Sequence, residues 1–228
     1  MKKVIEFLQD IRVNNNREWF EAHKARYKEA QEEFNTFTEK LLAGISGFDP
    51  SVRGLTVKDC TYRIYRDVRF SPNKDPYKTH MGAYVCPHGK KSGYAGYYFH
   101  IEPGVNGLPG QNFLTSGLYM PEPNVLKSAR WEIAENTEEF AASIKKAKGF
   151  ELGQGNKLKK VPAGFEPGAP YEEYVKLKDI YLERAVSDEF LLQDELAKVV
   201  TREFARTYDF ISILNKAVGY AFEENTDD

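Results

Sequence analysis

The strongest constraint on the fold is a change in hydrophobic period along the chain. From Thr56 to Met120, β-branched and aromatic residues alternate with polar ones between Gly and Pro residues, which is typical of a group of strands. On both sides of this segment, apolar residues recur at three- and four-residue steps, the spacing of amphipathic helices. The sequence therefore predicts an α+β fold, with a central antiparallel sheet over about residues 56–120 packed by N- and C-terminal helices.

The N-terminal part predicts two helices. Apolar residues at helical spacing predict a short helix over residues 4–11, which the three asparagines at 14–16 interrupt because asparagine favours turns and caps. Asn15, with Glu18 three residues later, resembles a capping box, so a longer helix is expected to begin there and to run to Ile45.

Four segments are predicted as strands of the sheet, and two later ones are candidates for it. The connections between the first four are short enough for antiparallel neighbours. In chain order the six segments are Tyr62–Phe70, Tyr77–Cys86, Tyr94–Glu102, Phe113–Met120, Lys157–Val161 and Leu177–Val186. The last one is expected at an edge of the sheet.

The C-terminal part returns to helical spacing. Pro123 suits a first helical turn, Thr137 suits a helix cap, and Ser187 suits the cap of a final helical pair. The acidic end from Glu223 to Asp228 is expected to be frayed.

Size and composition predict one domain over residues 1–228. A chain of 228 residues buries roughly 70–75% of its unfolded surface and needs no covalent staple, and no repeat, linker or composition break divides it. Cys60 and Cys86 are the two cysteines of a chain without an apolar leader, so we expect buried thiols and a cytoplasmic location. No apolar run reaches the roughly 18 residues of a membrane span, so no membrane partner is expected.

A basic tract over residues 62–80 is the candidate functional segment, with five Lys or Arg against two Asp. Two prolines and an asparagine in its middle predict a hairpin loop that sets Phe70 opposite Tyr77. That register pairs Arg69 with Lys78, Asp67 with His80 and Arg63 with Tyr84 on one face. Because Arg69 and Lys78 are like charges, the pairing favours an anion between them.

Three residues of this tract suggest more specific roles. Asp67 beside His80 would orient the imidazole and raise its basicity, as a general base near neutral pH requires. Arg66 points by alternation to the apolar face, so it needs either a buried carboxylate, with Asp59 and Glu102 as the nearest candidates, or a ligand.

The candidate site therefore has two predicted parts. The predicted catalytic residues are His80 and Asp67, and the predicted ligand-binding residues are Arg63, Arg66, Arg69, Lys78, Tyr77, Tyr98 and His100. Tyr98 and His100 share a strand face with Glu102 and are expected to complete a cleft wall.

The sequence predicts no metal site and leaves any cofactor unknown. Four histidines occur, His23, His80, His88 and His100, yet no two have the spacing that brings metal ligands together locally. A phosphate-binding loop, a dinucleotide fingerprint and a nucleophile elbow are all absent from the sequence.

The same residues carry a resemblance that covers nearly the whole chain. The matching motifs are Asn14-Asn-Asn-Arg-Glu-Trp-Phe20, His23-Lys24 with Tyr27, Tyr62-Arg-Ile-Tyr-Arg-Asp-Val-Arg-Phe70, Pro76-Tyr-Lys-Thr-His80, Gly96-Tyr-Tyr-Phe-His-Ile-Glu-Pro-Gly104 and Gly117-Leu-Tyr-Met-Pro121. Through them the chain resembles a bacterial family, domain of unknown function 2461. The resemblance implies an α+β single-domain protein and implies nothing about its activity. The chain differs locally at Ser71–Lys74, where such sequences often have an acidic residue near the loop tip.

Three functions remain open from the sequence. The first is binding of a small phosphorylated or carboxylated ligand, with acid/base catalysis by His80 as an extension. The alternative is a non-catalytic nucleic-acid or protein interaction module, which a net charge of −2 disfavours for nucleic acid. The third is a structural domain whose charged tract is a solvated sheet face.

Overall fold

The chain folds into a five-stranded antiparallel sheet with helices on one side, so the predicted α+β class is confirmed. The computed structural model describes residues 1–223. In that range the helices are α1 (Lys2–Val13), α2 (Arg17–Ala22), α3 (Lys24–Phe48), the 3-10 turn η1 (Pro50–Val52), α4 (Val57–Cys60), α5 (Pro123–Glu135), α6 (Thr137–Lys146), α7 (Glu172–Val175), α8 (Asp188–Leu191), α9 (Leu196–Ala205) and α10 (Tyr208–Glu223).

The sheet has the strand order β1-β2-β3-β5-β4. Its strands are β1 (Met81–Val85), β2 (Gly96–Ile101), β3 (Asn112–Leu118), β4 (Glu151–Leu152) and β5 (Ile180–Val186). The register sets Gly82 opposite His100 and Tyr84 opposite Tyr98, and it sets His100 opposite Phe113 on the other side. Since side chains alternate along a strand, these residues share one face of the sheet.

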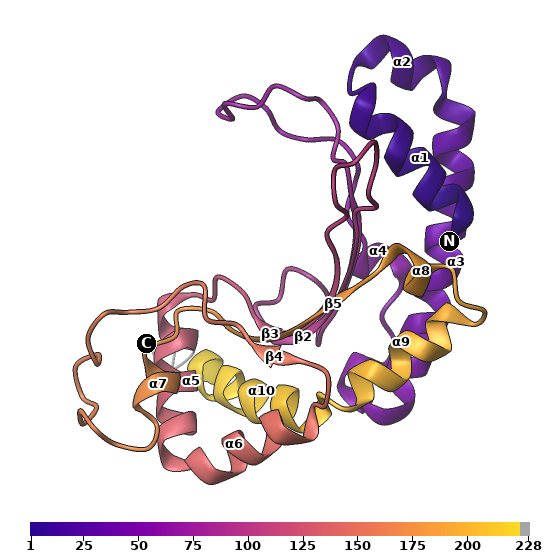
Figure 1. Cartoon of the computed structure of the whole chain (residues 1–228). Helices are drawn as coiled ribbons and strands as arrows, with labels where there is room; N and C mark the ends of the chain where they lie inside the picture. Colours follow the sequence, from indigo (N-terminus) through magenta and orange to yellow (C-terminus); the bar gives the residue numbers. More distant parts are fainter. Residues whose placement is uncertain (224–228) are drawn as a thin grey trace.

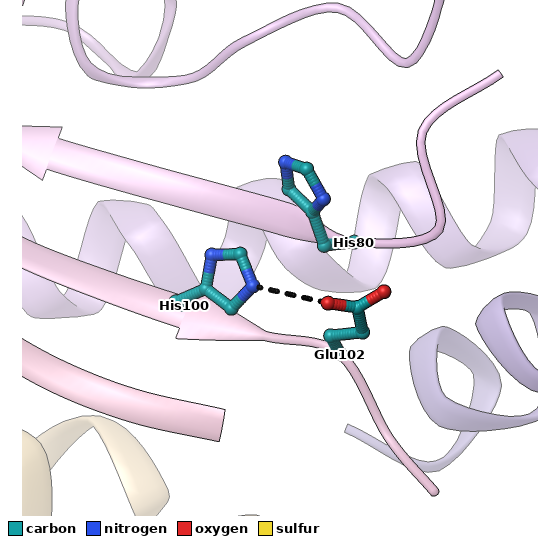
Figure 2. A group of neighbouring side chains, drawn as sticks. All are labelled: His80, His100 and Glu102. Carbon is teal, nitrogen blue, oxygen red and sulfur yellow. Dashed lines mark ion pairs between the residues drawn. The ribbon is translucent and has the colours of Figure 1, made fainter. Parts of the chain in front are cut away.

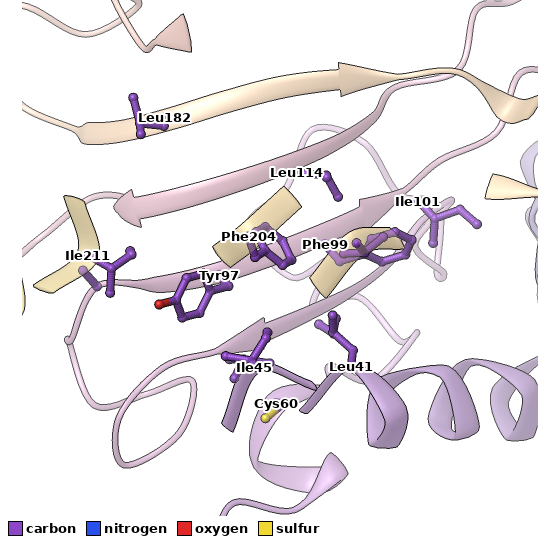
Figure 3. Packing of buried hydrophobic residues seen from close by; sticks show 14 of the residues in the cluster. Leu41, Ile45, Cys60, Tyr97, Phe99, Ile101, Leu114, Leu182, Phe204 and Ile211 are labelled. Carbon is purple, nitrogen blue, oxygen red and sulfur yellow. The ribbon is translucent and has the colours of Figure 1, made fainter. Parts of the chain in front are cut away.

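The opposite face of the sheet packs into the core. Tyr97 and Phe99 of β2 and Leu114 of β3 are fully buried there, together with Leu41 and Ile45 of α3 and Phe204 of α9 (Figure 3). α3 packs with α9, while α10 packs with α5, α6 and β3. Figure 1 shows these helices on one side of the sheet, while the loop of residues 61–80 extends away from it at the other side. One sheet face is therefore core and the other is available for a site.

The long N-terminal helix was predicted as continuous, and this prediction is wrong at His23. His23 has φ −111° and ψ 17°, and its ring stacks on Trp19 with the centroids 4.2 Å apart, so α2 ends there and α3 begins at the next residue. The cap of α2 is Asn16, whose side chain accepts the Trp19 N–H, and not Asn15. Asn15 bonds Tyr77 instead: its amide donates to Tyr77 O at 2.9 Å and accepts from Tyr77 N at 3.1 Å.

The segment predicted as a strand from Tyr62 to Phe70 is a loop, and its predicted register is wrong. Tyr77 forms an isolated bridge with Tyr65 and not with Phe70, and β1 begins only at Met81. Two backbone bonds flank this bridge, from Arg66 N to Pro76 O and from Lys78 N to Ile64 O. Beyond it local bonds replace a ladder: Asp67 accepts the Arg69 N–H and Asn73 accepts the Asp75 N–H. Side chains that bond nearby backbone compete with strand pairing, and proline supplies no N–H for it.

The later elements differ from the prediction in four places. Residues 157–161 form no strand but only an isolated bridge from Lys157 to Leu177. β5 is an inner strand, because β3 pairs with one side of it and the two-residue β4 with the other. Thr137 does not cap α6, since its hydroxyl donates back to the Ile133 and Ala134 carbonyls and Asn136 holds the cap position. Ser187 accepts the Phe190 N–H as a cap, but of the short α8.

The predictions for Pro123 and for the two cysteines are confirmed. Pro123 stands in the first turn of α5, and both cysteines are buried free thiols. Glu223 is the last residue of α10, and the rest of the acidic end lies outside the described residues. Within residues 1–223, none of the helices combines the length and the apolar character that crossing a membrane requires.

Candidate functional site

The face of the sheet turned away from the helices carries a cleft of about 500 Å³. Its floor comes from β1, β2, β3 and β5, and most of its side chains are aromatic. The lining residues are Tyr62, Tyr84, Lys90, Gly96, Tyr98, His100, Phe113, Thr115, Gly117, Tyr119, Tyr181 and Glu183. This volume falls in the range of about 300–1,000 Å³ that is usual for small-molecule sites.

A smaller cavity of about 160 Å³ adjoins the cleft. Both cavities are lined by Tyr62 and Tyr98, so these two side chains stand between them. The smaller cavity also reaches three basic residues of the predicted tract, Arg63, Lys78 and His80. Its far wall comes from α3.

Cations gather around Tyr62 at the junction of the two cavities. The Nζ atoms of Lys78 and Lys90 lie 5.3 Å and 5.8 Å from the centroid of its ring, within cation–π range. Lys78 is half-buried, and burial, followed by the charge of Arg63, lowers its pKa. Within residues 1–223 no carboxylate pairs with Lys78 or Arg63, as the ion pairs there involve other cations.

Three metal-ligating side chains meet at the end of the β1–β2 pair. The ligand atoms of His80, His100 and Glu102 all lie within 4.8 Å of one another, and His100 Nε2 is 3.8 Å from Glu102 Oε2. Figure 2 shows the three side chains converging from the start of β1 and the end of β2. The register explains this meeting: Met81 pairs with Ile101, so the residues just outside that pair, His80 and Glu102, are neighbours across the strands.

Two neighbours hold the His100 ring in place. Its Nδ1 lies 2.9 Å from the Tyr98 hydroxyl, and its plane stacks on Phe113 with the centroids 4.4 Å apart and 5° between the planes. Gly82 makes room for this arrangement, because a Cβ at that position would lie only 2.4 Å from the Tyr98 hydroxyl oxygen. The remaining nitrogen, Nε2, therefore points toward Glu102.

The electrostatics of the cluster favour a neutral His80 and an ionised Glu102. Burial lowers the pKa of His80 to about 4, and the neighbouring His100 adds to this effect. The His100 imidazole and then the Thr79 hydroxyl, which donates to Glu102 Oε1 at 2.5 Å, hold the pKa of Glu102 near 2 against the opposing effect of burial. The predicted raised pKa of His80 is thus wrong in sign.

The predicted contact between Asp67 and His80 is also wrong. Asp67 lies in the loop and forms an ion pair with Arg69, whose Nη2 is 2.6 Å from Asp67 Oδ2. The carboxylate that lies beside His80 is that of Glu102, because the register of β1 and β2 makes these two residues neighbours across the strands. The catalytic roles assigned to His80 and Asp67 stay predictions.

The structure brings some of the predicted ligand-binding residues together and separates others. Arg63, Lys78 and Tyr98 line the smaller cavity, and Tyr98 and His100 line the cleft. Tyr77 instead is buried and stacks on Phe20, with the ring centroids 4.0 Å apart.

The two remaining arginines of the tract lie in its loop. Arg69 is exposed and forms an ion pair with Asp67, so the predicted pairing of Arg69 with Lys78 is wrong. Arg66 is half-buried and donates to Asp75 O and Ser71 Oγ, so of the two alternatives the one with a carboxylate partner, Asp59 or Glu102, is wrong, and the one with a ligand stays a prediction.

Two site features were missed from the sequence. Lys90 lies over the ring of Tyr62 in the cation cluster, and the sequence predicted no role in the site for either residue. The contact of His80 with His100 and Glu102 could have been predicted from the short connection between their two strands. That prediction would have required the correct start of β1 at Met81.

Comparison with known proteins gives one match. The family model described as "Conserved hypothetical protein (DUF2461)" matches residues 3–212 of the 228-residue chain. Neither the curated proteins nor the solved structures contain a significant match. The match covers every strand of the sheet and all the side chains of both cavities.

Proposed function

The chain belongs to the DUF2461 family, and we propose that it binds a small organic anion on the open face of its sheet. The ligand class is a phosphate or carboxylate joined to an aromatic or apolar body. The observation that carries this proposal is Lys78, a half-buried cation next to Arg63 without a carboxylate partner in the described part of the chain.

An unneutralised pair of cations is the first support. Burial and then the charge of Arg63 lower the pKa of Lys78, so the two positive charges repel each other at this site. A phosphate or carboxylate between them would remove the repulsion, and the guanidinium can hold either group through two parallel bonds. Both residues line the same cavity, so one ligand group can reach both.

The adjoining cleft is the second support, because it suits the body of such a ligand. Its walls include Tyr84, Tyr98, Phe113 and Tyr181, whose rings offer apolar faces for stacking. A few polar groups among many aromatic ones is the usual composition of a small-molecule site. The anionic end would lie at Tyr62, where the two cavities meet.

The proposal concerns binding rather than proton transfer. With a pKa lowered to about 4, His80 is neutral at physiological pH and a weaker base than an ordinary histidine. It can accept or donate a hydrogen bond to a ligand as a neutral imidazole. Catalysis by His80 therefore adds nothing that the binding proposal needs.

The first prediction tests the anion with three small probes on the full-length protein in the presence of a chelator. Phenyl phosphate should raise Tm, since a ligand that binds only the native state stabilises it by about 2.7 kcal/mol at 100 times Kd. For a chain of this length that corresponds to a rise of roughly 5–10 °C. Inorganic phosphate and phenol, each half of the probe, should give smaller shifts.

Two variants locate the site. Lys78→Met removes the charge but keeps the length of the side chain, and should reduce the phenyl phosphate shift to that of phenol. Arg69→Gln is the matched control, because Arg69 lies in the loop with Asp67 and should leave the shift intact. Equal shifts with phenol and phenyl phosphate, or a full shift in Lys78→Met, would contradict the proposal. Tight, strongly salt-dependent binding of a duplex oligonucleotide instead would favour the nucleic-acid alternative.

A further inference from the structure

We propose that His80, His100 and Glu102 together bind a divalent first-row transition-metal ion. The inference is independent of the proposed anion, since it rests on a different set of side chains. No other His, Cys, Asp or Glu of the described residues joins this group, so three protein atoms would hold the ion.

The backbone already places the three donors on one side of one strand pair. His100 and Glu102 are two residues apart, so they project from the same face, and His80 stands across from Glu102 in the extended register. An ion about 2.0–2.1 Å from each donor holds them roughly 3–3.5 Å apart. The ligand atoms now lie up to 4.8 Å apart, so each would have to move by about an ångström to bind the ion. Side-chain rotation can supply such a movement.

The donor types select the class of ion. Two imidazoles and one carboxylate suit zinc and iron(II), whereas calcium and magnesium favour sets made of oxygen atoms. Sites with three protein ligands of this kind keep further coordination positions open, in contrast to closed structural sites with four. His100 also lines the cleft, so the open positions would face the space assigned to the organic ligand.

The surroundings of the donors resemble the outer shell of a metal site. A ligating histidine usually bonds through its other ring nitrogen to a fixed partner, and His100 Nδ1 has the Tyr98 hydroxyl 2.9 Å away. Ligating carboxylates are likewise hydrogen-bonded, and Glu102 accepts from Thr79. Stacking on Phe113 fixes the plane of the His100 ring, so that Nε2 is the free donor.

The second prediction tests metal binding with full-length protein stripped by a chelator and titrated with Co²⁺ and Zn²⁺ alone. Visible absorption of Co²⁺ and calorimetry of Zn²⁺ should both show one ion per chain, with micromolar affinity or tighter. His100→Ala and Glu102→Gln should each weaken binding more than about 100-fold, because loss of an outer-shell partner alone weakens it about 10–100-fold. Circular dichroism establishes that each variant is folded.

The matched control is His88→Asn. His88 is an exposed histidine outside the cluster, and its φ of 61° is one that asparagine tolerates. Its substitution should leave the Zn²⁺ affinity unchanged.

A further pair of variants probes the support of His100. Tyr98→Phe, which removes only the hydroxyl, and Gly82→Ala, which displaces it, should both weaken Co²⁺ binding about 10–100-fold. Millimolar binding to the unmodified chain, or equal affinity in the unmodified chain, His100→Ala and Glu102→Gln, would overturn the metal site. Neither outcome bears on phenyl phosphate binding through Lys78, which is measured with the chelator present.

Discussion

His80 shows how far a single residue can depart from its expected role when its neighbours change. Strand alternation paired it with Asp67 and predicted a raised pKa, whereas the structure places it beside His100 and Glu102. Burial and then the neighbouring His100 outweigh the one carboxylate, so the pKa falls to about 4. The error came from the register of one loop and not from the choice of residue.

The third prediction follows from this lowered pKa and concerns the metal-free protein. The unfolded chain takes up the His80 proton near pH 6.5 and the folded chain only near pH 4, so stability is full above pH 6.5 and falls as the pH drops between these values. The expected loss is on the order of 2–3 kcal/mol. Urea unfolding at pH 7 and at pH 4.5 measures it.

The matched variant is His80→Gln, in which the loss between pH 7 and pH 4.5 should shrink by the His80 contribution. Glu102 does not confuse this comparison, because its pKa near 2 places its own loss of stability at lower pH, between about 4.5 and 2. An unchanged difference between the two pH values in His80→Gln would show that other groups cause it.

At the scale of helices and strands, the hydrophobic period correctly predicted those elements that bury an apolar face in the core. β2 and β3 lie within one or two residues of their predicted bounds, and α5 begins at the predicted proline. The loop from Tyr62 to Phe70 has the same alternating texture, but it is joined to the second arm by two backbone bonds beside the Tyr65–Tyr77 bridge and not by a full ladder, and the Arg69 N–H bonds the Asp67 side chain. Hydrophobic period alone does not distinguish a polar residue on the exposed face of a strand from one whose side chain bonds nearby backbone in a loop.

The site was predicted to a similar degree. Tyr98 and His100 share the cleft face as alternation requires, because they stand on a strand whose bounds were right. Arg69 and Asp67 were misplaced because they stand where the predicted strand was a loop. Lys90 could not be found, since it comes from the connection between β1 and β2, for which period gives no direction.

Two asparagines hydrogen-bond the backbone of residues that precede β1 and β2. They are the subject of the fourth prediction. Asn215 of α10 accepts from Ala95 N at 2.8 Å and donates to Ala95 O at 3.1 Å, the same two bonds that Asn15 makes with Tyr77. Asn215→Ala and Asn15→Ala should each cost about 1–3 kcal/mol, because a buried backbone N–H and C=O lose their partners. Urea unfolding measures the cost.

The control for the asparagine variants is Asn35→Ala, an exposed position of α3. Its effect on the free energy of unfolding should stay within about 0.5 kcal/mol. Hydrogen exchange adds a local reading, since the amides of Ala95 and Tyr77 should lose protection in the corresponding variant. A cost no larger than that of Asn35→Ala would mean that water replaces these bonds.

At the scale of the whole molecule, the sheet separates stability from binding. Phe99 points into the core, where its ring lies 4.6 Å from Phe37, while its neighbour Tyr98 lines both cavities on the other face. Adjacent residues of one strand therefore serve different purposes.

The fifth prediction uses this pair of neighbours. Phe99→Ala should cost about 3–5 kcal/mol of stability and leave the phenyl phosphate Kd unchanged at a temperature where the variant is folded. Tyr98→Ala should cost about 1–2 kcal/mol and abolish detectable binding. Denaturant unfolding and calorimetry supply the two readouts. Equal loss of affinity in both variants would show that the cleft depends on the core rather than on Tyr98 itself.

The position of β5 beside β3 has a consequence for folding during synthesis on the ribosome. β3 can pair with β2 once both have been synthesised, but its other neighbour, β5, follows only after residues 119–179. Throughout that interval the nascent sheet presents the unpaired backbone of β3, an edge that can pair with another chain. His80, His100 and Glu102 emerge before this interval, so the proposed metal ligands are complete in sequence while the sheet that carries them is still open.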